Sequence, residues 1–96
     1  MVKIHGNWCG PNWTAGQIKP AKDMIPSDYR VPCTDKLDCA CKVHDIDVFE
    51  RGGRTRGSDS RLSNVAIRIA YDFRQPRWLR KKALVVAYGM LIGRSP

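Results

Sequence analysis

Asp38-Cys39-Ala40-Cys41-Lys42-Val43-His44-Asp45 is the stretch that decides the fold of this chain. Around it, apolar residues recur at spacings of three and four, which is the pattern of one helical face. Gly52-Gly53 follows as a stop signal, so the pattern predicts a helix over residues 35–51. On this helix His44 lies on the apolar face, and Asp45 points about a quarter-turn aside.

Two more helices are predicted after the glycines. Ser58-Asp59-Ser60 supplies an N-cap, which assigns Asp59 to capping, and one apolar face then predicts a helix over 58–75. A third helix is expected over 76–92, with Pro76 at its first position. The first two helices should pack antiparallel, with the third behind them. Residues 1–34 are rich in Gly and Pro and predict an ordered loop region with at most one short helical turn.

Length and composition predict a single, mainly α domain over residues 1–96. There are 17 Lys and Arg against 9 Asp and Glu, a net charge of +8, which excludes an acidic tail and favours anionic partners. So small a core needs staples or a bound ion, and four cysteines are available. The longest apolar run is too short to span a membrane. The N-terminus lacks a signal-peptide pattern, which leaves a removed targeting segment, a piece of a longer protein or another export route.

A second stretch gives the His-Asp pair a chemical context. An arbitrary pair of this kind is more often a core histidine beside a surface aspartate. Here, however, Trp8-Cys9-Gly10-Pro11-Asn12-Trp13-Thr14-Ala15-Gly16 predicts a tight loop that can turn successive backbone carbonyls inward. Calcium prefers six to eight oxygen ligands, and such a loop with one helical carboxylate supplies most of them. Asp45 would be that carboxylate.

The two stretches together resemble the secreted-type phospholipases A2. That family joins a calcium loop of the form X-Cys-Gly-X-Gly to a helix carrying Cys-X-X-His-Asp. In this chain the two motifs are Trp8-Cys9-Gly10-Pro11-Asn12 and Cys41-Lys42-Val43-His44-Asp45. The short length, few cysteines and Gly-Pro in the loop most resemble the parvovirus capsid phospholipase domain, and the Trp-Cys-Gly start is also similar to the insect venom group. The resemblance covers residues 5–75.

The resemblance implies calcium-dependent hydrolysis of the sn-2 acyl ester of glycerophospholipids at a membrane surface. His44 matches the general base, which takes a proton from the attacking water. Asp45 matches the calcium-ligating carboxylate, and the backbone carbonyls of Trp8, Gly10 and Asn12 match the loop ligands. The implied fold is a calcium-loop region packed on the antiparallel helix pair and stapled by disulfides.

The cysteines are expected to form two disulfides. If Cys9–Cys41 staples the loop to the helix, Cys33 and Cys39 remain to pair locally. An even number of cysteines in a short chain favours an oxidising setting, and the resemblance implies a secreted or virion-associated protein. It would be a monomer or a domain of a larger protein, such as a capsid protein.

Three departures from the family pattern affect the site. Asn12 replaces the second loop glycine, although asparagine tolerates left-handed backbone angles. Val48 stands where the family has a tyrosine, four residues after the histidine. The family also orients its histidine with a carboxylate on the next helix. In this chain Asn64 and Asp72 are the two candidates for that role, and they are equally placed.

The basic residues suit an anionic lipid surface, and no specific nucleic acid is expected. The set that carries this expectation, cations beside apolar and aromatic residues, is Arg54, Arg56, Arg61, Arg77, Arg80, Lys81 and Lys82 with Trp78, Leu79 and Tyr88. Trp8 and Trp13 either line the access of the acyl chain or belong to the core.

The alternative to an enzyme is a non-catalytic basic module that binds membranes or nucleic acid on the same scaffold. In its zinc-stapled form, the ligands would be Cys33, Cys39, Cys41 and His44.

Overall fold

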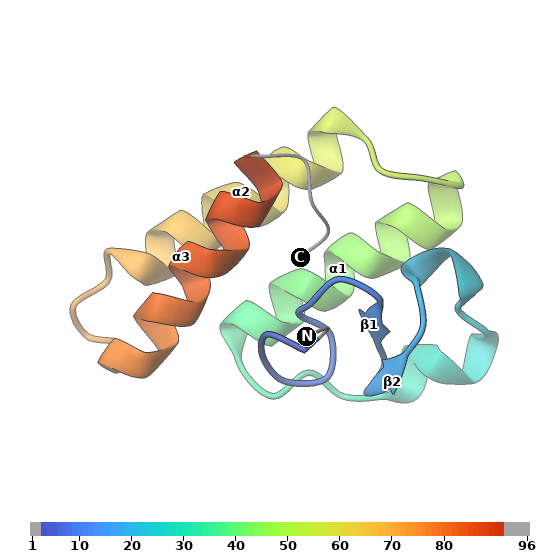
Figure 1. Ribbon diagram of the computed structural model, residues 1–96, viewed down its shortest axis with the longest axis horizontal. Coiled ribbons are helices and arrows are strands. Elements are labelled where there is room, and N and C mark those ends of the chain that lie inside the picture. Colours follow the sequence, from blue (N-terminus) through green and yellow to red (C-terminus); the bar gives the residue numbers. More distant parts are fainter. Residues whose placement is uncertain (1–2, 92–96) are drawn as a thin grey trace.

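The computed structural model describes residues 3–91, which form three long helices and a loop region laid along the first of them (Figure 1). The helices are α1 (Lys36–Arg51), α2 (Arg56–Ala70) and α3 (Arg77–Leu91). The mainly α class and the stapling by two disulfides are therefore confirmed. None of the described helices has the length and apolar character needed to cross a membrane.

The loop region contains more local structure than the sequence predicts. β1 (Trp13–Thr14) and β2 (Gln17–Ile18) form an antiparallel hairpin, and two 3-10 helices follow: η1 (Ala21–Asp23) and η2 (Pro26–Arg30). Ala15 and Gly16 have φ angles of 54° and 73°, as a two-residue hairpin turn requires. The expectation of at most one short helical turn is wrong, because the prolines that read as breakers precede or open the two 3-10 helices.

α1 has the bounds that its sequence predicts to within one residue. Asp35 is the N-cap, since its side chain accepts a hydrogen bond from the backbone N–H of Asp38. The helix ends at Gly52, whose φ of 74° lies in the left-handed region that glycine adopts without strain.

α2 differs from its predicted bounds of 58–75 at both ends. Its N-cap is Thr55, which exchanges capping hydrogen bonds with Ser58, so the helix begins at Arg56 and Asp59 is free for another role. It ends at Ala70, and the residues up to Pro76 form a turn that Asp72 stabilises by accepting the backbone N–H of Arg74. α3 starts one residue after the predicted position, and the predicted end at residue 92 lies outside the described residues.

α2 and α3 pack side by side as an antiparallel hairpin, and α1 packs against α2 (Figure 1). One cluster of buried apolar side chains joins all three helices to the loop region. Trp8 is fully buried in this cluster, together with Leu37 of α1, Leu62 of α2 and Val86 of α3. Of the two roles left open for Trp8, the core role is the one it has.

The loop region is tied to α1 by one buried carboxylate and two covalent links. Asp38, which is fully buried, accepts the backbone N–H groups of Asn7, Trp8 and Thr34. Cys9–Cys41 and Cys33–Cys39 form the two expected disulfides. These contacts hold the loop that precedes β1 against the face of α1 that carries the His-Asp pair.

Candidate functional site

His44 and Asp45 line a cavity of about 220 Å³ between the loop region, α1 and the α1–α2 connector. The loop contributes Gly10 and Asn12, which were expected to lie near Asp45. The complete lining is Gly10, Asn12, Thr14, Pro20, Ala21, Lys22, His44, Asp45, Val48, Gly52, Gly53 and Arg54. The structure therefore brings the two sequence motifs to one site.

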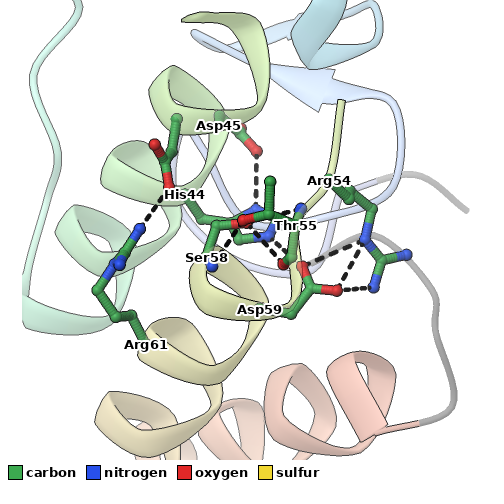
Figure 2. A network of polar contacts seen from close by, with 8 residues as sticks. His44, Asp45, Arg54, Thr55, Ser58, Asp59 and Arg61 are labelled. Carbon is green, nitrogen blue, oxygen red and sulfur yellow. Dashed lines mark hydrogen bonds and ion pairs between the residues drawn. The ribbon is translucent and has the colours of Figure 1, made fainter. Parts of the chain in front are cut away.

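The two nitrogens of the His44 imidazole have different surroundings: Nε2 is hydrogen-bonded to Asp59, and Nδ1 faces Asp45 at ion-pair distance without a hydrogen bond (Figure 2). Its Nε2 lies 2.7 Å from Oδ1 of Asp59 on α2, a hydrogen bond that a protonated Nε2 donates. Its Nδ1 is buried without a hydrogen-bond partner among the described residues, 3.8 Å from Oδ1 of Asp45. In its neutral form, an imidazole held in this way carries its proton on Nε2 and leaves Nδ1 unprotonated, which is what a general base requires.

The carboxylate of Asp59 is held by His44 and Arg54, while the N-cap of α2 is Thr55. Oδ1 accepts from His44, while the guanidinium of Arg54 donates from Nε to both oxygens at 3.2 Å and from Nη2 to Oδ2 at 2.6 Å. Arg54 comes from the connector, so the network joins α1, the connector and the first turn of α2 (Figure 2).

Sequence reasoning placed the histidine's partner at the wrong residues. Asn64 lies further along α2 and is exposed, and Asp72 lies beyond the end of α2, where it pairs with Arg74. The physical reason lies in the connector: Gly53 and Arg54 line the cavity beside Val48, so the chain runs back along α1 before α2 starts. The hydrogen bond of His44 therefore goes to the first turn of α2 and not to its middle. The capping pair Thr55 and Ser58 is the sequence signal that would have released Asp59 from a capping role.

The carboxylates around the ring determine its charge state. Burial lowers the pKa of His44, but Asp45 and Asp59 outweigh burial and raise it above its usual value. Burial also acts to raise the pKa of Asp59, but Arg54 and His44 hold it below the usual range, so this carboxylate is ionised. Asp45 differs, because burial raises its pKa to about 6 against the opposing effect of His44.

Asp45 is a buried carboxylate that can hold a cation. It is 4% exposed, and its Oδ2 has no hydrogen-bond partner within the described part of the chain. A buried, ionised oxygen without a partner is costly, and a bound cation removes that cost. Across residues 3–91 no three His, Cys, Asp or Glu side chains are grouped to hold a metal, so a cation at Asp45 would depend on backbone carbonyls. The residues present fit calcium in this respect.

The loop backbone supports this fit in part. Asn12 has a φ of 53°, so asparagine does adopt the left-handed angle expected where the family has glycine. Gly10 has a φ of 143° and lines the cavity with Asn12. The third proposed ligand, the carbonyl of Trp8, belongs to a residue whose ring is turned into the core. Trp13 is half-buried, and its indole N–H donates to the carbonyl of Gly6.

A second, more apolar groove of about 330 Å³ lies between α1 and α2, and His44 forms part of its wall as well. Its apolar lining comes from Ala40 and Val43 of α1 and from Leu62 and Val65 of α2. Its charged lining residues are Arg61, Arg68 and Asp47, and Asp47 is in an ion pair with Arg61. One histidine thus borders both a polar cavity and an apolar groove, which no feature of the sequence indicated.

The residues expected at a lipid surface do not all lie on one surface in the structure. Trp78, Lys81, Leu84, Val85 and Tyr88 are all exposed and recur at helical spacing, and we call them the outer face of α3. Leu79, which was expected at the same surface, is buried in the core instead. Arg54 and Arg61 are occupied by Asp59 and Asp47.

The residues proposed as zinc ligands are already engaged in other contacts. All four cysteines form disulfides, and His44 is hydrogen-bonded to Asp59. No protein-family model, curated protein or solved structure matches this chain.

Proposed function

We propose that the protein is a calcium-dependent phospholipase A2 that hydrolyses the sn-2 acyl ester of glycerophospholipids at a membrane surface. The observation that carries the proposal is the state of His44. One ring nitrogen is hydrogen-bonded to Asp59. The other has no hydrogen-bond partner among the described residues and lies 3.8 Å from Asp45, whose Oδ2 also lacks a hydrogen bond there. This arrangement suits a base that activates water next to a cation.

In the proposed reaction, Nδ1 of His44 accepts a proton from a water molecule as its oxygen attacks the ester carbonyl. Asp59 stabilises the imidazolium that forms and keeps the ring in place. The same proton then passes from His44 to the departing glycerol oxygen, so that a fatty acid and a lysophospholipid are released. Calcium held by Asp45 and the carbonyls of Gly10 and Asn12 would supply charge stabilisation for the ester oxygen and the phosphate.

The surroundings of the site support a lipid substrate. The apolar groove that borders His44 offers room for an acyl chain. The outer face of α3 presents exposed apolar and aromatic side chains together with Lys81, and Arg77 lies beside it. Aromatic rings and cations on one helical face suit the boundary of a bilayer that contains anionic lipids.

The test is hydrolysis of mixed anionic vesicles whose lipids carry different acyl chains at the two positions, in calcium or in chelator. Mass spectrometry should detect release of the sn-2 acid in calcium alone. His44→Gln should abolish the release and leave the helical circular dichroism unchanged, because the glutamine retains much of the side-chain volume but is no base. Binding to the vesicles without any release of fatty acid would favour the non-catalytic membrane module.

A further inference from the structure

Arg54 occupies an unusual position for a surface arginine. It lies on the connector between α1 and α2, lines the cavity with His44 and Asp45, and has its side chain about three-quarters buried. Both ends of the connector are fixed: the N–H of Gly53 donates to the carbonyl of Val48, and Thr55 caps α2. The backbone that carries Arg54 is therefore held in place, and its guanidinium is placed by the contact with Asp59.

The contact of Arg54 with Asp59 is the planar, two-oxygen contact that arginine makes best. Nε contacts Oδ1 and Oδ2 at 3.2 Å each, and Nη2 contacts Oδ2 at 2.6 Å. Oδ1 is also the oxygen that accepts from His44 at 2.7 Å. The guanidinium of Arg54 thus orients the carboxylate of Asp59. That carboxylate in turn orients the imidazole of His44.

Asp59 needs such a constraint. Its side chain is 23% exposed, and His44 and Arg54 are the partners that the described structure gives to its carboxylate. If Arg54 were absent, rotation toward water would cost Asp59 a single hydrogen bond, which is a small net energy. The imidazole would then lose the acceptor that fixes its tautomer.

We propose that Arg54 is a positioning residue, which locks Asp59 so that the imidazole of His44 keeps its proton on Nε2 and its free electron pair on Nδ1. The inference deepens the proposed function, on which its catalytic consequence rests. Arg54 acts through Asp59 and makes no contact with the reacting atoms in this scheme.

The first readout needs neither calcium nor substrate. Nitrogen NMR of the His44 ring, recorded at alkaline pH where the ring is neutral, should show one tautomer in the wild type, protonated at Nε2. Arg54→Ala should show a mixture of both tautomers. Arg51→Ala is the matched control, because Arg51 is also in an ion pair with an aspartate, Asp47, whose described hydrogen bonds go to arginines and not to the ring.

The second readout is kinetic. Arg54→Ala should lower kcat about 10- to 100-fold with little change in KM, as expected when a supporting contact of a catalytic group is lost. Arg54→Lys retains the cation without the planar two-oxygen contact, and its kcat and tautomer ratio should lie between those of wild type and Arg54→Ala. This variant also keeps the test open if Arg54→Ala fails to fold.

The two readouts separate the failure of this inference from that of the proposed function. A single Nε2-protonated tautomer in both Arg54 variants would overturn the positioning role, as would an unchanged kcat in an active enzyme. If the wild type hydrolyses no phospholipid, the proposed function fails, and the tautomer ratio alone decides whether Arg54 positions the ring.

Discussion

His44 is the residue at which α1, α2 and the connector meet, and Asp59 is its link to α2. Asp59→Asn keeps an oxygen that can accept from Nε2 but removes the negative charge that stabilises the imidazolium. We expect turnover to fall by roughly 10²- to 10⁴-fold, with calcium affinity nearly unchanged.

Asp72→Asn is the control for this prediction. It removes a carboxylate just beyond the other end of α2, where the partner is Arg74 and not the ring. Its turnover should match the wild type. Equal losses of turnover in both variants would show that the charge of Asp59 has no specific role.

Asp45 should make stability depend on pH in a direction opposite to that of most carboxylates. Its pKa in the calcium-free fold is about 6, against 3.8 in the unfolded chain. The folded state therefore binds the proton more tightly, and the stabilisation is complete below about pH 4 and lost as pH rises through 6. In chelator, Asp45→Asn should melt at a higher temperature than the wild type above pH 6, and the difference should shrink in acid.

Calcium should make the wild type melt at a higher temperature than Asp45→Asn. The wild type gains stability with calcium excess because only the folded site binds, and Asp45→Asn should show little gain. Thermal melts in chelator and in calcium, on both sides of pH 6, check both statements. A wild-type melting temperature that does not respond to calcium would contradict the proposed site.

At the scale of elements, the docking of the loop region on α1 depends on Gly6. Its φ is 61°, and a Cβ at this position would overlap the carboxyl group of Asp38, which accepts the N–H groups of Asn7 and Trp8. Gly52 has a similar φ of 74° but open space where its Cβ would be. Substitutions at these two glycines therefore distinguish the cost of a strained backbone from the cost of a steric overlap.

Gly52→Ala should cost about 1–2 kcal/mol of unfolding free energy, the cost of left-handed backbone alone. Gly6→Ala should cost about 1–3 kcal/mol more, because the buried carboxyl must also move. Urea unfolding of both variants measures the difference. Equal losses of unfolding free energy in the two variants would mean that the carboxyl group of Asp38 can move aside without an energetic cost.

The elements also show what the sequence can predict and what it cannot. α1 was predicted correctly because its apolar spacing, its capping aspartate and Gly52 all indicate the same helix. The bounds of α2 were wrong because Thr55 and Ser58 form a cap without the usual acidic residue. The path of the connector follows from packing against α1, which no local pattern encodes, and both Arg54 and Asp59 were misassigned as a result.

At the scale of the whole molecule, the protein has a net charge of +8 and also an exposed surface of apolar and aromatic side chains, the outer face of α3. Lys81→Glu should weaken binding to anionic vesicles at least about fivefold, since a cation near such a surface contributes roughly 1 kcal/mol. Arg30→Glu changes the net charge equally but lies in η2. Cosedimentation with vesicles compares the two variants.

Binding of the wild type should fall as salt increases, because salt screens exposed charges. If Arg30→Glu weakens binding as much as Lys81→Glu does, total charge and not the outer face of α3 governs the contact.

The two disulfides are unevenly distributed over the molecule. Both of them attach the loop region to α1, while the α2–α3 hairpin is joined to that half by the connector and by non-covalent packing. His44 belongs to the half that the disulfides staple and Asp59 belongs to the other, so the hydrogen bond on which the proposed activity depends joins the two halves. Partial opening between the two halves would disable the protein while each half kept its helices. On gentle heating, activity should therefore disappear before the circular dichroism of the helices does, and on cooling it should return as soon as the two halves close.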